Sequence, residues 1–262
     1  MSYGERISIK SRRELDRMRE AGRHTGEILL LLREAAKPGV RTGELNEIAS
    51  RELERRGLRS PFLGYSPGGL PPYPAVLCVS INDEIVHGIP GSRELKEGDI
   101  LSLDFGVDFE GFHGDSAVTI PIGSVPGETH QLVETTRDSL YEGIAKMVPG
   151  KRLSDIGHAV QVKAEKAGYS VVRQFVGHGI GREMHEPPQV PNYGRKGRGP
   201  RLTAGMVFAI EPMVNVGSEE VRMLEDEWTA VTADGALSAH FEHTVAITDE
   251  GPEVLTAVHG SH

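Results

Sequence analysis

The chain has 262 residues, a formal net charge of −9 at pH 7 and a single cysteine. The acidic balance argues against nucleic acid as the main partner, and one cysteine excludes a disulfide framework or a cysteine-based structural zinc site. No apolar run is long enough to span a membrane, and residues 1–10 lack the apolar core of a secretory signal. We therefore expect a globular protein of the cytoplasm, a reducing compartment.

Helical patterns open both halves of the chain. Apolar and small residues recur at helical spacing over 11–34, where Ser11 and Glu14 have the spacing of a capping box. Further helices are expected over 42–56, 129–147 and 154–167. Segment 37–58 aligns without gaps with 148–169 at a spacing of 111 residues, and five residues are identical in the two segments. We interpret this alignment as an internal duplication.

Strand patterns follow the helices in each half. The first half has a loop rich in Pro, Gly and Tyr over 60–75, a strand over 75–81 and a hairpin over 99–119. In the second half, strands are predicted over 171–176, 206–210, 220–224, 228–232 and 238–248. Helices in one layer and antiparallel strands in another predict an α+β fold with pseudo-two-fold symmetry. We expect a single domain over 1–262, with halves of about 1–123 and 124–262.

The predicted hairpin carries two acids where apolar side chains are normal. In its sequence DILSLDFGVDFEGFHGDSAVT, apolar residues alternate along each arm, but Asp104 and Asp115 interrupt them. A register symmetric about Phe109 and Glu110 places the two acids opposite each other, unless a bulge shifts it by one residue. Adjacent carboxylates repel each other unless a cation or a shared proton lies between them. A divalent metal ion is the simplest resolution.

Four further residues stand where they could complete a metal site. His178 lies in VGHGIG, His185 in MHEPPQ, Glu211 at the end of the predicted strand MVFAIEP, and Glu242 inside SAHFEHTVAIT. Singly, such residues are more often solvated acids or hydrogen-bonded histidines, but acids set into apolar strands favour a common site. A set rich in oxygen and poor in sulfur suits two divalent first-row ions with room for water, an arrangement common in hydrolases.

The order and setting of these residues resemble a known family. Settings LDFG, FHGDSA, GHGIG, IEPM and FEHT, together with NDEIVHGIP, resemble the type I methionine aminopeptidases over essentially the whole chain. The resemblance implies the pita-bread fold, two similar halves with an antiparallel sheet flanked by helices around a metal site. It also implies removal of the initiator methionine from nascent peptides and proteins, with a small second residue preferred. Two divalent ions are implied, and the sequence leaves Co, Mn, Fe and Zn open.

The resemblance assigns a role to each ligand. Asp104 would chelate one ion, Asp115 and Glu242 would bridge both, and His178 and Glu211 would complete the second. Glu211 would also take and return the proton of the attacking water. The free amine of the substrate would lie near Asp104, which would explain exopeptidase action.

The same resemblance implies residues that contact the substrate. His185 would steady the developing oxyanion, and His87 would contact the scissile amide or the departing nitrogen. Met184 stands where well-studied bacterial members have Phe, and we expect a reshaped pocket that still prefers methionine. The residues that match the methionine pocket, with His87 and His185 beside it, are Tyr65, Tyr73, Cys78, Met184 and Trp228.

Two other functions stay open. An Xaa-Pro aminopeptidase or prolidase would share the fold and the ligands, but these enzymes usually carry an extra N-terminal domain for which this length leaves no room. Only 25 residues separate His185 from Glu211, too few for the helical insertion of type II enzymes. A pita-bread binding protein that has lost catalysis would have lost ligands, and all five are present here.

The partners expected from the sequence are few. Besides the N-terminal methionine of nascent chains, we expect a monomer with no DNA or membrane partner. The basic loop 195–201, RKGRGPR, is either a solvated connection or a weak contact with ribosomal RNA.

Overall fold

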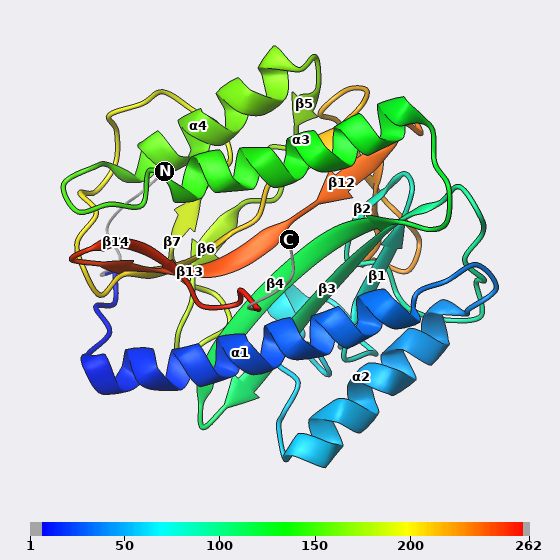
Figure 1. The fold of residues 1–262 in the computed structure, drawn as a ribbon, viewed down its shortest axis with the longest axis horizontal. Helices are drawn as coiled ribbons and strands as arrows, with labels where there is room; N and C mark the ends of the chain where they lie inside the picture. The colour runs from blue at the N-terminus through cyan, green and yellow to red at the C-terminus, as the bar shows by residue number, and fades with distance from the viewer. Residues whose placement is uncertain (1–6, 259–262) are drawn as a thin grey trace.

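The structure, a computed structural model, describes residues 7–258 (Figure 1). Residues 1–6, part of the segment used to argue against a secretory signal, and residues 259–262 lie outside it. Within 7–258, no helix is both long enough and apolar enough to cross a membrane. The helices are α1 (Arg12–Ala35), α2 (Thr42–Arg56), the 3-10 turn η1 (Pro67–Gly69), α3 (Gly127–Ile144) and α4 (Leu153–Lys166).

The strands are short except for the hairpin of the first half and the strand that meets it. Their bounds are β1 (Cys78–Ile81), β2 (Glu84–Val86), β3 (Ile100–Phe109), β4 (Phe112–Pro121), β5 (Ser170–Val171), β6 (Gly177–Gly179), β7 (Glu186–Val190), β8 (Val207–Ile210), β9 (Met213–Asn215), β10 (Val221–Met223), β11 (Ala230–Thr232), β12 (Ser238–His240), β13 (Glu242–Thr248) and β14 (Gly251–Val254).

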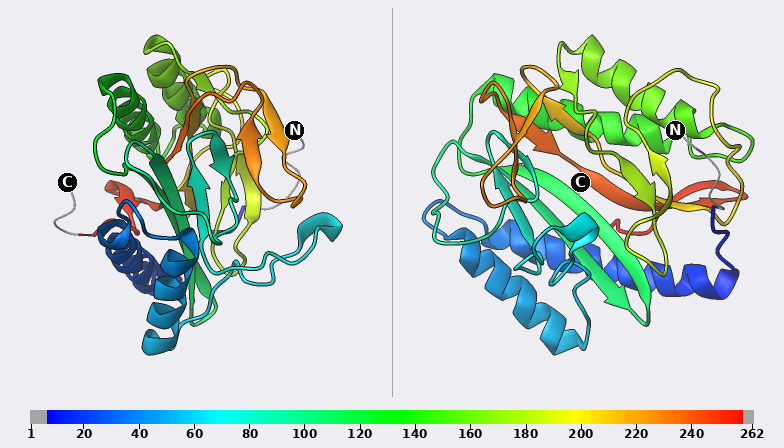
Figure 2. Two further views of the ribbon diagram at one scale, coloured as in Figure 1. Left: turned by 90° about the vertical axis from the view of Figure 1, so that its right-hand side faces the viewer. Right: turned by 180° about the vertical axis from the view of Figure 1, so that it is seen from behind.

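One antiparallel sheet joins the two halves of the chain. Its order is β1-β3-β4-β13-β8-β6-β7, with β14 paired to β13, so the last strand of each half's trio meets at the centre. Two smaller sheets, β10-β11-β2 and β12-β9-β5, complete the strand layer. The four α-helices lie along one face of the main sheet, and β10, β11 and η1 lie on the other side (Figure 2). The predicted α+β architecture with helices in one layer is confirmed.

The two halves repeat the same connection between helix and sheet. The N–H of Gly39 donates to the carbonyl oxygen of Leu95 at 2.8 Å. Gly150, which follows Gly39 by 111 residues, donates to the carbonyl oxygen of Leu202 at 2.9 Å. Two further donor pairs at this spacing bond the same connection, Thr42 with Leu153 and Gly43 with Ser154. The internal duplication inferred from the sequence is thus present in the backbone geometry.

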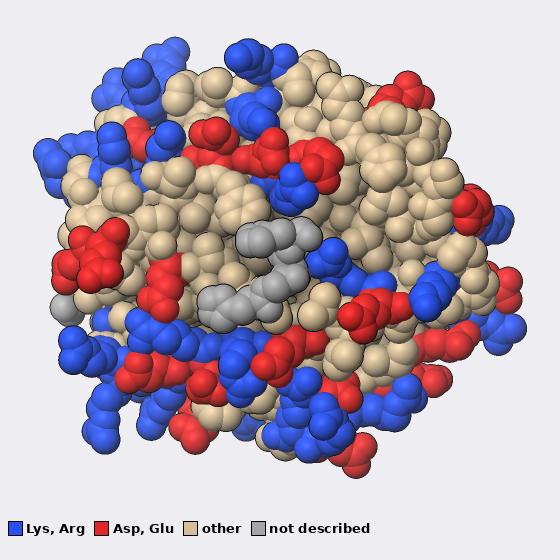
Figure 3. All heavy atoms as spheres, in the orientation of Figure 1, with Lys and Arg blue, Asp and Glu red and all other residues tan. Residues whose placement is uncertain are grey.

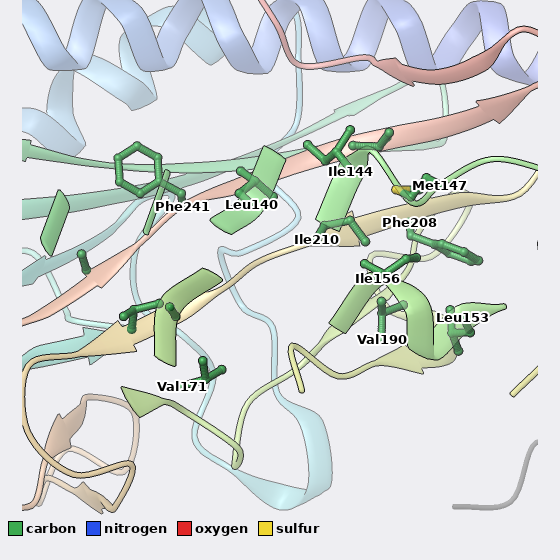
Figure 4. Close-up of a cluster of buried hydrophobic side chains, with 14 of the residues drawn as sticks. Leu140, Ile144, Met147, Leu153, Ile156, Val171, Val190, Phe208, Ile210 and Phe241 are labelled. Atoms are coloured by element: carbon green, nitrogen blue, oxygen red, sulfur yellow. The ribbon is translucent and has the colours of Figure 1, made fainter. Parts of the chain in front are cut away.

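Each half has its own apolar core beneath its helices. One core includes Leu32, Leu45 and Phe105 in the first half, and another includes Leu140 and Phe208 in the second. Figure 4 shows the second core, where side chains of α3 and α4 lie close to those of β7 and β8. The outer surface of α1 is lined by alternating acidic and basic side chains, which form ion pairs at i,i+3 and i,i+4 (Figure 3).

The register of the central hairpin differs from the predicted one. Asp104 pairs with Ala117, and Asp115 pairs with Gly106, so the two acids are diagonal neighbours rather than opposite each other. The prediction was wrong because the tight turn is formed by Glu110 and Gly111, with φ of 51° and 77°, as in the type I′ turn that suits strand twist. Because each acid moves past a partner of the same parity, both carboxylates still lie on one face.

Other strand predictions were also corrected. The strand expected over 171–176 ends at Val171, and the segment 238–248 is two strands in two different sheets, separated at Phe241. Strand β7 was not predicted because it contains Pro187 and Pro188, but it lies at the edge of the sheet, where proline is tolerated. Long-range pairing therefore decided these segments, and local pattern did not.

Helix α1 crosses the hairpin at a contact that leaves no room for a side chain. A Cβ added at Gly114 would lie 2.7 Å from the backbone nitrogen of Gly22, and Thr25 Oγ1 lies 3.1 Å from the carbonyl oxygen of Gly114. We predict that Gly114→Ala lowers the free energy of unfolding of the metal-stripped protein by about 1–3 kcal/mol, measured by urea denaturation. Gly127→Ala, where a Cβ meets nothing within 4 Å, is the matched control and should change stability little. Equal stability of the two variants would contradict the prediction.

Candidate metal centre

One cavity of about 470 Å³ gathers all of the predicted site residues. It lies between strands of the two halves, with the carboxylates at its floor and aromatic side chains around its walls. The predicted residues that line it are Tyr65, Tyr73, Cys78, His87, Asp104, Asp115, His178, Met184, His185, Glu211, Trp228 and Glu242. Residues more than 170 positions apart in the chain therefore share one chamber.

The four carboxylates of the cavity lie close together with little solvent. Asp115 and Glu242 are 4% and 2% exposed, and Asp104 and Glu211 are partly buried. Burial raises the pKa of Asp104 to about 7. Burial, followed by the charges of neighbouring carboxylates, raises the pKa of Asp115, Glu211 and Glu242 well above the usual range. Without a counter-charge these acids resist ionisation.

The strands hold the backbone of these acids and leave their carboxylates free. The hydroxyl of Thr244 accepts the N–H of Asp115 at 2.9 Å and donates to its carbonyl oxygen at 2.8 Å. The hydroxyl of Ser116 donates to the carbonyl oxygen of Glu242 at 2.7 Å. In contrast, Oδ1 of Asp104, Oδ1 of Asp115 and Oε1 of Glu242 are buried and have no hydrogen-bond partner among the described residues.

His178 completes a group of ligand atoms that fits a divalent cation. One ligand atom each from Asp115, His178 and Glu242 lie within 4.8 Å of one another. Nδ1 of His178 is 2.8 Å from the carbonyl oxygen of Gly179, and Nε2 lies 3.5 Å from Oε1 of Glu211. A proton held on Nδ1 leaves the lone pair of Nε2 aimed at the carboxylates. Burial lowers the pKa of His178 to about 3, so the ring is neutral, as a metal ligand requires.

Two more histidines project into the cavity from loops. Nδ1 of His185 lies 2.9 Å from the hydroxyl of Tyr65, and its ring centroid is 4.3 Å from that of His178. His87 follows β2 with φ of 62°, an uncommon conformation for a non-glycine residue, and its ring meets Trp228 edge-on. Burial, followed by the neighbouring His185, lowers the pKa of His87 to about 4. These rings are therefore neutral hydrogen-bonding groups at pH 7.

The remaining wall of the cavity is apolar. Met184 and Cys78 are 8% and 5% exposed, and the rings of Tyr73 and Trp228 meet edge-on with centroids 5.1 Å apart. Indole Nε1 of Trp228 donates to the carbonyl oxygen of Pro71 at 3.0 Å, which fixes the plane of that ring. Sulfur and aromatic groups are suited to contact a thioether side chain.

Sequence reasoning missed five lining residues that the fold brings to the cavity. They have no shared spacing, and each lies in a loop or at a strand end, where local pattern carries little information. Phe175 had a weak signal, since it lies three residues before His178, and its ring meets that of His87 edge-on at 5.4 Å. The residues missed are Phe62, Gln174, Phe175, Met223 and Glu227.

Comparisons with known proteins agree with this site. Residues 16–249 match the family described as Metallopeptidase family M24. The methionine aminopeptidase of Clostridium perfringens is 51% identical over 252 residues, which cover 96% of this chain and 99% of that protein. The crystal structure of methionine aminopeptidase from Thermotoga maritima is 42% identical, with a TM-score of 0.93, and covers 97% of this chain and 100% of that one.

A more distant comparison concerns the main alternative. Prolidase from Pyrococcus furiosus has a TM-score of 0.75 but only 20% identity, and the match covers 95% of this chain and 65% of that protein. At this identity the likeness shows a shared pita-bread fold alone. The chain belongs to the methionine aminopeptidases of metallopeptidase family M24.

Proposed function

We propose that this protein removes the N-terminal methionine from newly made polypeptides in the cytoplasm and prefers a small second residue. One observation carries the proposal. The cluster of unpartnered carboxylates and the apolar, sulfur-containing wall line the same cavity, so a methionine side chain and its peptide bond are held together beside the metal ligands. A cavity of about 470 Å³ has the size of a small-molecule pocket.

Charge balance supports two divalent ions as the cofactor. Four carboxylates in one cavity are neutralised by two divalent cations, and the nearby imidazole adds a neutral ligand. The ligands that we assign are Asp104, Asp115, His178, Glu211 and Glu242. When bound, such ions would lower the pKa of a water and polarise the carbonyl of the first peptide bond. Oxygen and imidazole ligands suit Mn, Fe, Co and Zn, and availability in the cell selects among them.

The chain's own residues orient the substrate and move protons. Glu211 lies 3.5 Å from Nε2 of His178, at the edge of the carboxylate cluster, where it can take a proton from water and return it to the leaving amine. His185 and His87 are neutral and can donate a hydrogen bond to the peptide group as charge develops on it. We also assign the attraction of the substrate's free amine to Asp104, which favours cleavage at a chain end.

The specificity for methionine rests on the apolar wall. A proline-directed enzyme must accommodate a ring after the scissile bond, whereas the feature observed here is a soft pocket of Cys78, Met184, Tyr73 and Trp228. Such pockets discriminate between similar apolar side chains by about 10- to 200-fold. We therefore propose methionine over leucine at the first position by a factor in this range.

Release of free methionine tests the proposed function directly. Metal-stripped protein should be inactive on Met-Ala-Ser, and added Mn²⁺ or Co²⁺ should restore cleavage. Leu-Ala-Ser, Met-Lys-Ser and Ala-Pro peptides should be poor substrates. Glu211→Gln should lower kcat by at least ~100-fold, since it removes the proton acceptor. Cleavage of the Ala-Pro peptide alone would move the protein to the proline-directed branch, and metal binding without any cleavage would leave a binding protein.

The carboxylate cluster also predicts how stability depends on pH without metal. The pKa of Asp104 rises from 3.8 to about 7 on folding, so the folded chain binds more protons than the unfolded chain between these values. The free energy of unfolding of metal-stripped protein should therefore fall as pH rises from 6.5 to 8. Below pH 6.5 the buried histidines act in the opposite sense, because their pKa is lowered on folding.

Thermal unfolding at pH 6.5, 7.25 and 8 measures this effect. Added Mn²⁺ should raise Tm more at pH 8 than at pH 6.5, because protons compete with the metal for the same carboxylates. Asp104→Asn removes one of the shifted groups and should flatten the pH dependence of the metal-stripped protein. An unchanged slope in Asp104→Asn would show that the pH dependence arises elsewhere.

We further propose a transient ribosome contact through the basic loop 195–201. Its backbone is tied to the start of α4, where Gly197 donates to Asp155 at 2.7 Å and Arg198 donates to Ser154 at 2.7 Å. The side chains of Arg195, Lys196 and Arg198 are exposed, and Lys and Arg gather at this edge of the molecule (Figure 3). A held loop with free basic side chains is suited to RNA phosphates.

Co-sedimentation with ribosomes tests this contact. Changing Arg195, Lys196 and Arg198 together to Ala should weaken ribosome binding by at least ~10-fold and reduce its salt dependence, with cleavage of Met-Ala-Ser unchanged. Binding that is equally strong in the triple variant would assign loop 195–201 to a solvated connection.

A further inference from the structure

A buried ion pair joins the segment before α1 to the loop that carries His185. Nζ of Lys10 lies 2.7 Å from Oε2 of Glu186, and the two side chains are only 5% and 13% exposed. The hydroxyl of Ser8 donates to the same carboxylate oxygen at 2.5 Å. The N–H of Lys10 donates to the carbonyl oxygen of Gly205 at 2.8 Å, which fixes this segment beside β8. Such a pair keeps one geometry, because separating it would leave an uncompensated buried charge.

The second oxygen of Glu186 holds the loop itself. Oε1 accepts the N–H of Arg182 at 2.7 Å and that of Glu183 at 3.4 Å. The stem of Lys10 packs against Gly181 so closely that a Cβ there would lie 2.5 Å from Cε of Lys10. One carboxylate therefore ties the turn at 181–183 to the segment before α1.

The turn held in this way leads directly to two residues of the cavity. Met184 belongs to the apolar wall, and His185 contacts both Tyr65 and His178. Lys10 and Glu186 are not among the described residues that line the cavity. Any effect of this pair on the reaction must therefore pass through the loop that it holds.

We propose that Lys10 and Glu186 are positioning residues for the aminopeptidase reaction, and that their ion pair sets the place of His185 in the cavity. The inference rests on the proposed function, because it requires His185 to act on the peptide. Hydrogen bonds in an active site lose much of their effect when a donor is displaced by about 1 Å. The N-terminal segment is thus part of the machinery that orients the reacting groups.

Kinetics of Met-Ala-Ser cleavage by Mn²⁺-loaded protein test the proposal. Lys10→Met should lower kcat by at least ~10-fold, and Lys10→Arg, which keeps the charge, should recover most of it. In a His185→Ala background, Lys10→Met should change kcat by less than about twofold, because residues that act through one group are not additive. Arg19→Met is the matched control, since it breaks the exposed Arg19–Glu253 ion pair on the same N-terminal helix and should leave kcat unchanged.

The double variant Lys10→Met/Glu186→Gln separates positioning from stability. It removes both charges together, so Tm should recover relative to Lys10→Met, while kcat should stay low because the loop is no longer tethered. Recovery of both Tm and kcat would overturn the proposal and leave the pair with a structural role only. Full additivity of Lys10→Met with His185→Ala would overturn it too. Failure of the unaltered protein to cleave Met-Ala-Ser would instead reject the proposed function.

Discussion

The structure depends on holding four carboxylates in one nearly dry cavity. Each of these acids costs free energy when ionised there, and each raises the cost for its neighbours. The strands do not allow the acids to move apart, because Thr244 fixes the backbone of Asp115 and Ser116 fixes that of Glu242. The repulsion can be relieved only by protons or by cations. This cavity therefore couples metal binding to pH and to the stability of the fold.

Duplication explains how such a cluster can be assembled. The first half supplies Asp104 and Asp115 from one hairpin, and the second supplies His178, Glu211 and Glu242 from strands or strand ends. The pairing of β4 with β13 sets Glu242 beside Ala117, two residues from Asp115. Glu211 follows Asp104 by 107 residues, the same spacing that relates Leu202 to Leu95 in the repeated connection. Neither half alone contains the centre.

The sequence allowed the helices, the hairpin and the metal-ligand candidates to be predicted, because each depends on local periodicity or on an acid in an apolar setting. The register of the hairpin was not predictable from alternation, since it depends on positive φ at Glu110. The break at Phe241 and the lining role of Phe175 were not predictable either. Both follow from where distant strands pair, which is a property of the whole sheet. The face shared by Asp104 and Asp115 survived the register error because a shift that keeps parity keeps the face.

The two kinds of site residue are held by different means, and this difference bears on what can vary. The carboxylates are fixed by backbone hydrogen bonds within the central strands, so their positions follow from the fold itself. His185 lies on a loop, where its place depends on the hydroxyl of Tyr65 and on the carboxylate of Glu186. A change in such side-chain contacts can retune the substrate side of the cavity without moving the metal ligands. Proteins that share this fold at 20% identity, such as the prolidase, can therefore keep the architecture while the loops around it differ.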